Sequence, residues 1–303
     1  MKLSFYITSD SFGLPDCSLK RLEVIVDNLF NLSKEISRDT NNDSLSVTSE
    51  AYCIVWKGHS LGEVWTDTCQ MDKDLKILIQ KILQEYSKPV DFDKAKIDEL
   101  ILSNNEQERT VIIKATDNKG SINEDILDVE NKNWFDIHRN FLGKYPVDCN
   151  YFVEECRIYF PYIYFHDRTK GSVRQILTEF SERIVHHLSG LNDKLRVLQN
   201  TFGEMNREKI LEILSMKEYG NFDKVATLEG KSSRKENFTF DFPLNSKENS
   251  FEKVCCEPHI KLCKANLGSG DNSYHTDKRI YFHEGKSHIQ DGKILVGHIG
   301  KHL

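Results

Sequence analysis

The amino-acid sequence predicts an α+β protein in two parts: an N-terminal mixed α/β domain over residues 1–168 and, over residues 169–303, a C-terminal domain of two helices packed on an antiparallel sheet. Three observations lead to this prediction. The chain of 303 residues is longer than a typical domain of roughly 100–200 residues. Helical spacing of apolar residues and strand-like alternation both occur in the first part. The last strand-like segments are separated only by turns and loops, which is typical of antiparallel pairing.

The N-terminal part alternates between strand-like and helical segments. Residues 1–8 form the first expected strand, and Ser18 then begins a helix because its side chain suits an N-cap. A second helix is expected over residues 75–86 and ends before Pro89, which cannot continue a helix. The remaining expected elements are a hairpin made of residues 51–57 and 63–66 and a β-branched strand over residues 110–116.

The middle of the chain combines one apolar segment with two helical ones. Residues 151–165 carry apolar side chains at both odd and even positions, which predicts a central strand covered on both faces. We interpret residues 166–168 (His-Asp-Arg) as the polar end of that strand rather than as a catalytic trio. A long amphipathic helix is expected from Ser172 to Leu198, and a second helix begins near Asn206.

Composition and cysteine usage indicate a globular protein in a reducing compartment. Hydrophobic residues make up 39% and charged residues 29% of the chain, which excludes the disordered and membrane classes. Apolar runs are far shorter than the ~20 residues that span a bilayer. The eight cysteines are scattered, so we expect reduced thiols and no disulfides. With no signal-like N-terminus, a cytoplasmic location without membrane contact is expected.

The charge is distributed unevenly along the chain. The formal net charge is −6, yet residues 251–303 contain eight Lys and Arg against six Asp and Glu. This segment also holds six of the eleven histidines. An anionic partner, if the protein has one, is therefore expected to meet the C-terminal segment. A solvated surface explains the same composition without a partner.

Four strand-like runs close the chain, at residues 238–242, 254–264, 278–284 and 293–300. Because successive side chains of a strand point to opposite faces, each run can be divided by parity. One face of the resulting sheet is apolar, and the helices before it are expected to cover that face. The other face is expected to be uncovered and to carry His259, Lys261, Arg279, Tyr281 and His283, with His298, Lys301 and His302 near its edge.

These residue types suit cleavage of RNA without a metal. Histidine serves as a base or an acid near neutral pH, cations stabilise the charge on phosphorus oxygens, and tyrosine donates a proton or stacks on a base. A polar, solvent-facing side of an antiparallel sheet is the alternative interpretation and requires no function. The expected catalytic residues are His259, Lys261, Arg279, Tyr281, His283 and His298, and the expected nucleic-acid-binding residues are Lys264, Lys278, Lys301 and His302.

A zinc site is a competing chemical interpretation of the same region. Cys255, Cys256, His259 and Cys263 are soft ligands that lie close together in the sequence. However, adjacent residues such as Cys255 and Cys256 point to opposite faces of a strand, and the sequence has no Cys-x2-Cys pair. We therefore expect neither a metal nor another cofactor.

Three short segments follow the predicted helices: residues 257–262 (Glu-Pro-His-Ile-Lys-Leu), 279–283 (Arg-Ile-Tyr-Phe-His) and 293–301 (Lys-Ile-Leu-Val-Gly-His-Ile-Gly-Lys). This succession resembles the C-terminal strands of the RelE/ParE toxin superfamily, and the resemblance covers at most residues 172–303. It implies that Lys261, Arg279, Tyr281 and His298 belong to an active surface. The chain departs from the family in its acidic charge, its large N-terminal part and its longer loops, and the ParE branch does not cut RNA.

Two functions are consistent with these features. The first is a toxin-like effector whose C-terminal sheet cleaves RNA or acts on the translation machinery, with the N-terminal domain regulating it or docking a partner. The second is a non-enzymatic subunit of a multi-protein bacterial anti-phage defence or toxin–antitoxin complex that uses the same basic sheet for contact. RNA, the ribosome and a protein are the expected partners.

Overall fold

The chain forms two compact units, Met1–Ile137 and His138–Leu303. The boundary lies before the expected one at residue 168, because the strand at residues 163–165 pairs with the last strand of the chain and so belongs to the second unit. Both units combine helices with sheets, in agreement with the α+β prediction. The computed structural model describes residues 2–13, 17–38, 43–53, 55–56, 59–60, 71–105, 108–115, 125–195, 207–214, 226–228, 232–245, 250–262 and 278–303.

The first unit is built on a five-stranded sheet in the order β5-β2-β1-β6-β7, in which every pairing is parallel. β6 is buried at five consecutive positions, and only a strand covered on both faces has this pattern. The expected strands at residues 1–8 and 110–116 are therefore confirmed. The strands are β1 (Lys2–Ile7), β2 (Ser44–Thr48), β5 (Lys88–Val90), β6 (Glu108–Lys114) and β7 (Ile126–Asp128).

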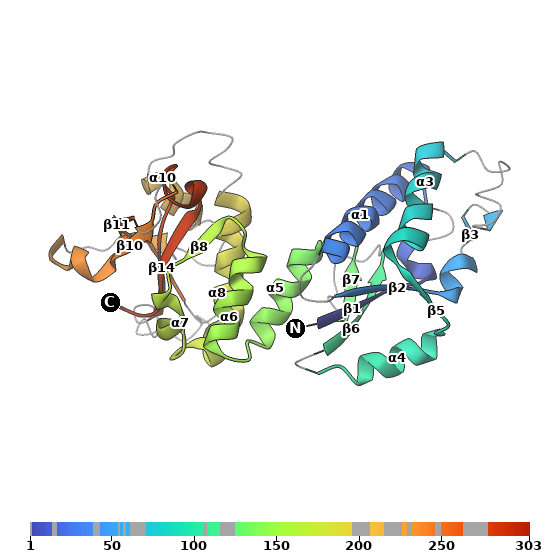
Figure 1. Cartoon of the computed structure of the whole chain (residues 1–303), viewed down its shortest axis with the longest axis horizontal. Coiled ribbons are helices and arrows are strands. Elements are labelled where there is room, and N and C mark those ends of the chain that lie inside the picture. Colours follow the sequence, from blue (N-terminus) through green and yellow to red (C-terminus); the bar gives the residue numbers. More distant parts are fainter. Residues whose placement is uncertain are drawn as a thin grey trace. The chain divides into compact units, whose positions relative to one another are not determined.

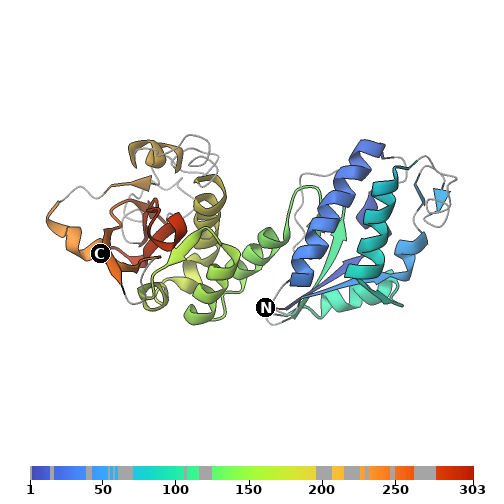
Figure 2. The ribbon, with the colours of Figure 1, turned by 45° about the horizontal axis from the view of Figure 1, so that its top comes forward.

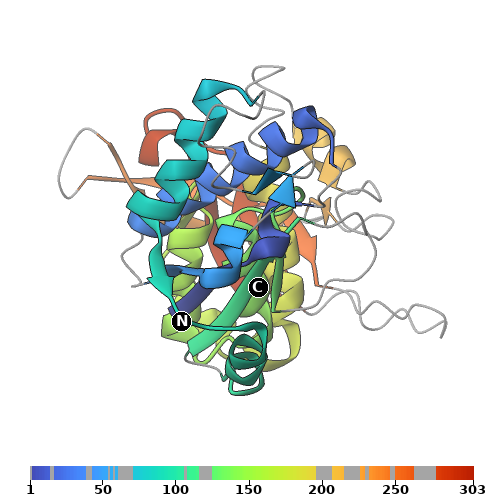
Figure 3. The same ribbon diagram turned by 90° about the vertical axis from the view of Figure 1, so that its right-hand side faces the viewer.

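Helices cover both faces of this sheet (Figure 1). α1 (Leu19–Arg38) and α3 (Lys73–Lys81) run side by side on one face, as Figure 2 also shows, and α4 (Lys94–Leu102) packs on the other. Figure 3 views this unit end-on. The two expected helices are confirmed, and a π-helical turn (Ile82–Tyr86) extends α3.

Short elements complete the first unit. Two 3-10 turns, Ser9–Phe12 and Ser49–Cys53, follow β1 and β2. β3 (Val55–Trp56) and β4 (His59–Ser60) form an antiparallel pair. This pair is shorter than the expected hairpin: residues 51–53 belong to the 3-10 turn, and β4 lies in the expected connection between the arms. The expected second arm of that hairpin, residues 63–66, lies outside the described residues.

The prediction of a strand over residues 151–165 is wrong for most of this segment. α6 (Cys149–Tyr159) occupies the larger part of it, and only Ile163–Phe165 form a strand, β8. Asp148 caps α6 by accepting hydrogen bonds from two backbone N–H groups. A short run that is apolar at both parities also satisfies helical spacing, so periodicity alone does not separate the two structures. α5 (Trp134–Lys144) precedes α6.

The helix expected from Ser172 begins later, as α8 (Leu177–Ser189). A separate short helix, α7 (Arg168–Val173), covers Ser172 and Val173 and starts before the expected position. Ile176 lies between the two helices, and its φ of −124° and ψ of −6° are not helical. A π-helical turn (Gly190–Leu195) extends α8, and residues 196–198 lie outside the described residues. α10 (Arg207–Leu214) confirms the second helix. Among the described residues, no helix is long and apolar enough to cross a membrane.

The second unit holds a five-stranded sheet in the order β8-β14-β13-β12-β9. β8 pairs with β14 in parallel, whereas the other pairings are antiparallel. The expected antiparallel sheet is therefore mixed, because it gains a strand from before α8. The remaining strands are β9 (Ala226–Thr227), β12 (His259–Lys261), β13 (Lys278–His283) and β14 (Ile294–Lys301).

A separate antiparallel hairpin consists of β10 (Thr239–Pro243) and β11 (Phe251–Cys255), and a 3-10 turn (Ser232–Phe238) leads into it. The expected strand over residues 254–264 is therefore shared between two sheets. The backbone N–H of Cys256 still bonds to the hairpin, at Phe238, whereas the carbonyl of Pro258 accepts a bond from Phe282 of β13. The chain changes sheet between Cys256 and Pro258. A last 3-10 turn, Gln290–Gly292, precedes β14.

We predict that Gly297→Ala destabilises the second unit by about 1–3 kcal/mol, because a Cβ at this position would overlap the ring of Phe240. Urea unfolding followed by far-UV circular dichroism measures the change. Gly171→Ala in α7 is the matched control: a Cβ there meets no atom within 4 Å, so it should leave stability unchanged or raise it. Equal effects of the two substitutions would contradict this packing.

Candidate functional site

The strand registers bring three of the expected catalytic residues into one row. His259 of β12 lies opposite Tyr281 of β13, which lies opposite His298 of β14. The ring centroids of His259 and Tyr281 are 5.3 Å apart, and those of Tyr281 and His298 are 5.9 Å apart. Parity within each strand accounts for His259 and Tyr281, whereas His298 reaches the same face because the register of β14 shifts by one residue between Val296 and His298.

A second row lies next to the first, toward one end of the sheet. Lys261 is opposite Arg279, and Arg279 is opposite Gly300. The Arg279 guanidinium donates a hydrogen bond to the Tyr281 hydroxyl at 3.2 Å, which ties the two rows together. His283, at the other end of β13, lies opposite Leu295. The six expected catalytic residues share one face of the sheet.

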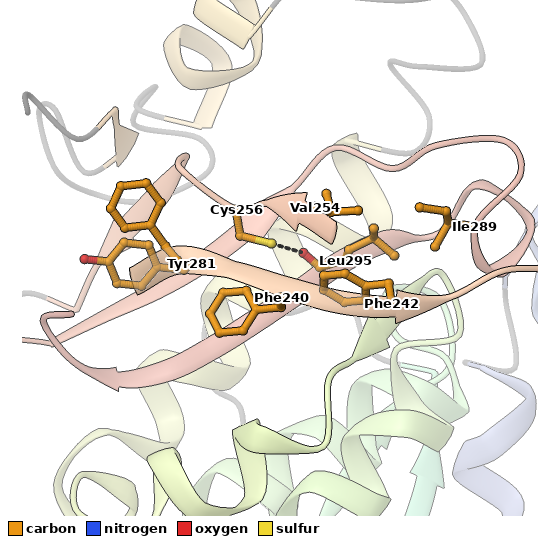
Figure 4. Close-up of a cluster of buried hydrophobic side chains, with 8 residues drawn as sticks. Phe240, Phe242, Val254, Cys256, Tyr281, Ile289 and Leu295 are labelled. Atoms are coloured by element: carbon orange, nitrogen blue, oxygen red, sulfur yellow. Dashed lines mark hydrogen bonds between the residues drawn. The ribbon is translucent and has the colours of Figure 1, made fainter. Parts of the chain in front are cut away.

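This face is not the open surface that the sequence predicts. His259, Arg279, Tyr281, His283 and His298 each expose at most 6% of their surface. The β10–β11 hairpin packs on this side of the sheet, and Figure 4 shows its side chains in one buried cluster with Tyr281 and Leu295. Phe238 stacks on Tyr281, with ring centroids 5.9 Å apart. The expectation of an uncovered face is therefore wrong, because the chain itself supplies a second layer.

The hairpin belongs to the core of the unit and does not behave as a lid. Six Val, Leu, Ile and Phe side chains are buried where it meets the sheet, and exposing each one costs about 1.5–3 kcal/mol. Their sum is comparable to the total stability of roughly 5–15 kcal/mol that holds a domain folded. Lifting the hairpin would therefore cost about as much as unfolding. The buried side chains that fill this contact are Phe238, Phe240, Phe242, Val254, Cys256, Tyr281, Ile289 and Leu295.

Burial keeps the imidazoles of this face neutral. It lowers the pKa of His259 and of His298, each to about 4, and it also lowers the pKa of His283. His259 Nε2 lies 2.8 Å from the Thr227 hydroxyl, and His298 Nε2 lies 2.8 Å from the Lys301 carbonyl oxygen. These contacts fix the rings in place. A neutral, enclosed imidazole cannot exchange protons with a substrate in solution, so the expected catalytic roles gain no support from this geometry.

Basic side chains gather where β12 and β14 end and β13 begins. Lys278 lies directly opposite Lys301, next to the pair of Lys261 and Arg279. His302 belongs to the same end, because it and Lys261 both lower the pKa of His259, after the larger effect of burial. Lys301 is exposed, and Lys261, Lys278 and His302 are partly exposed. Three of the four expected nucleic-acid-binding residues thus lie together, whereas Lys264 lies outside the described residues.

Lys278 does not belong to the hairpin-covered face. Its ammonium lies 5.5 Å from the centre of the Phe180 ring of α8, on the helix-covered face. Lys301, its direct neighbour across the strands, shares that side. Lys261 and Arg279 belong to the hairpin side. The basic residues therefore surround the end of the sheet instead of lining one face of it.

The residues that follow β8 have structural contacts. The carboxylate of Asp167 accepts a hydrogen bond from Arg157 at 2.7 Å, and His166 Nδ1 accepts one from the backbone N–H of Arg168 at 3.1 Å. The His166 ring also packs near Phe240 and Phe242 of the hairpin. These contacts agree with the interpretation of residues 166–168 as the polar end of a strand.

The cysteines of the C-terminal region do not form a cluster of ligands in the described part of the chain. No three His, Cys, Asp or Glu side chains among the described residues are grouped so that they could hold a metal ion. Cys255 is partly buried and Cys256 is buried, and both thiols are free. Burial raises the pKa of the Cys256 thiol well above its usual value. Cys263, the third cysteine of the proposed set, lies outside the described residues.

Sequence reasoning missed a pocket of about 440 Å³ in the first unit. It lies between α1 and the segment that joins β7 to α5. The polar residues Asn28, Asn31 and Glu35 of α1 recur at helical spacing and form a polar stripe beside the apolar one. This polar stripe is the sequence signal for the α1 side of the pocket. The lining residues are Asn28, Asn31, Leu32, Glu35, Val129, Glu130, Asn131, Lys132, Asn133, Trp134 and Phe135.

Comparison with models of known protein families, with curated proteins and with solved structures found no match for this chain. The resemblance of the C-terminal strands to the RelE/ParE superfamily therefore stays a hypothesis.

We predict that the second unit loses stability as the pH falls from about 6.5 to about 4. An unfolded histidine takes up a proton near pH 6.5, whereas His259 and His298 resist protonation in the fold until about pH 4. Above pH 6.5 both states are neutral and the contribution is complete. By about pH 4, protonation of these two histidines in the unfolded chain lowers the free energy of unfolding by on the order of 3 kcal/mol for each ring.

Hydrogen exchange of the β13 amides, measured at several pH values in this range, reports the effect in the second unit. His259→Gln removes one of the two rings and should make stability less dependent on pH. Unchanged protection of β13 between pH 7 and pH 5 would contradict the neutral, buried state of these imidazoles.

Proposed function

We propose that this protein is a non-catalytic binding protein that contacts the phosphate backbone of RNA through the basic end of its C-terminal sheet. The observation that carries the proposal is the direct opposition of Lys278 and Lys301, next to Lys261 and Arg279. The proposal corresponds to the second of the two functions that the sequence suggests, a subunit that uses its basic sheet for contact.

The charges at this end repel one another in the isolated protein. Like charges directly opposite each other in a sheet are destabilising, and neighbouring strands are only about 5 Å apart. Lys261, Lys278 and Lys301 form no ion pair with a carboxylate among the described residues. An anion bound across the strand ends would remove this repulsion, which favours an anionic partner.

The arrangement suits a polymer of phosphates better than a single small anion. The cations lie at the ends of three neighbouring strands and on both sides of the sheet, so they do not converge on one point. Lysine acts as a flexible point charge and does not require a fixed geometry from its partner. A nucleic-acid strand presents a charge at every nucleotide and gains affinity by releasing its counterions to such a surface.

Binding is proposed here without cleavage. His259, His283, His298 and Tyr281, which would carry proton transfer, are buried, and Tyr281 packs in the same cluster as the hairpin. That the protein is a subunit of a bacterial defence or toxin–antitoxin complex also stays a prediction from the sequence.

We expect the full chain to bind a short, fluorescently labelled single-stranded RNA with an affinity that falls as salt is added. Lys301→Ala and Lys261→Ala should each weaken binding and reduce the slope of log K against log salt concentration by about 0.7, the value for one lost phosphate contact. Fluorescence anisotropy at several salt concentrations measures both quantities.

Lys253→Ala is the matched control, because this exposed lysine of β11 lies opposite Asp241 and so has an acidic neighbour. It should leave the affinity and the slope unchanged. The same RNA, examined on a denaturing gel after incubation, should remain intact. Absence of binding at low salt would reject the proposal, and shortened RNA that depends on His302 would restore the effector hypothesis.

A further inference from the structure

The pocket of about 440 Å³ in the first unit lies within the range of roughly 300–1,000 Å³ that small-molecule sites occupy. A protein partner would instead need a surface of about 800 Å² on each side. One wall is α1, and the other is the segment of residues 129–135. The size favours a small molecule as the occupant.

The wall formed by residues 129–135 is held rigidly in place. Asp128 accepts hydrogen bonds from the backbone N–H of Glu130 and from the side chain of Asn131, at 3.1 and 2.6 Å. Arg21 at the start of α1 donates two hydrogen bonds to the Glu130 carboxylate, at 3.0 and 2.7 Å. A wall fixed in this way loses little conformational entropy when a ligand binds.

The far end of this wall is fixed equally well. The Trp134 indole donates to the Asp43 carboxylate at 2.9 Å, and the backbone N–H of Leu3 in β1 donates to the same carboxylate at 2.8 Å. Asn133 and Asp136 exchange side-chain-to-backbone hydrogen bonds at 3.0 and 3.1 Å and so cap α5. The wall is thereby anchored to the central strand of the sheet.

The α1 wall presents polar side chains to the pocket. Asn28, Asn31 and Glu35 recur at helical spacing and line the pocket, whereas Leu32 between them is buried. No described residue bonds to the side chains of Asn28 and Asn31. Asparagine is a poor helix former, so neither residue is explained by the stability of α1.

We propose that this pocket binds a neutral sugar, with a pyranose ring as the unit recognised. Amide side chains both donate and accept hydrogen bonds, which matches hydroxyl groups that also do both. Leu32, Val129 and Phe135 offer apolar contact to the C–H face of a sugar ring. The charges of the lining balance: Glu35 and Lys132 have opposite signs, and Arg21 neutralises Glu130, which favours a neutral ligand.

The test uses the full chain and the methyl glycosides of glucose, galactose, mannose and N-acetylglucosamine. Saturation-transfer NMR detects binding, and isothermal titration gives the affinity of any sugar that binds. We expect binding of at least one glycoside, weakened about tenfold by Asn28→Ala and by Asn31→Ala, since each removes hydrogen bonds to the ligand. Both substitutions raise helix propensity, so the variants should remain folded.

Asp27→Ala is the matched control, because Asp27 is exposed on the same helix but does not line the pocket. It should leave sugar binding unchanged. The proposal is overturned if none of the four glycosides binds at millimolar concentration, if both asparagine variants bind like the original protein, or if glucose 6-phosphate binds more tightly than methyl glucoside. The RNA-binding lysines lie in the other unit, so their loss does not enter this test.

Discussion

The packing of the β10–β11 hairpin on the C-terminal sheet determines what the polar residues of that sheet can do. Phe238 lies flat on Tyr281, and the Phe240 ring occupies the space that the absence of a side chain at Gly297 provides. This contact converts a row of titratable groups into part of an interior. A histidine in this interior contributes packing and hydrogen bonds and carries no charge near neutral pH. The basic side chains that solvent reaches, Lys261, Lys278 and Lys301, lie at the end of the sheet.

The sequence predicts local features of this arrangement well and distant ones poorly. The alternation of Arg279, Tyr281 and His283 on β13 follows from backbone geometry alone, and the structure has these residues on one face. Whether that face is covered depends on Phe238 and Phe240, which belong to a different layer. From the sequence, their segment is expected to be one more strand of the same sheet, because the pattern of a strand does not indicate which sheet the strand joins.

The same distinction explains the errors in the helical regions. The apolar stripe of α1 has one clear period and is predicted correctly, whereas residues 151–165 are apolar at both parities and are compatible with two structures. The N-cap at Asp148 favours the helix, but it lies outside the apolar run. The pocket beside α1 required both of its walls, and the wall at residues 129–135 has no regular period to reveal it.

A single extra residue determines which way the end of the chain faces. Tyr281 pairs with His298 but Phe282 pairs with Val296, so Gly297 forms a β-bulge in β14. Uninterrupted alternation would group Ile299 with Leu295 and send His298 to the helix side. The bulge reverses this order for the final residues and keeps Ile299 among the helices. If Gly297 paired regularly and the bulge were absent, His298, Ile299 and Lys301 would each turn to the opposite face of the sheet. The orientation of Lys301 therefore depends on an irregularity four residues earlier in the strand.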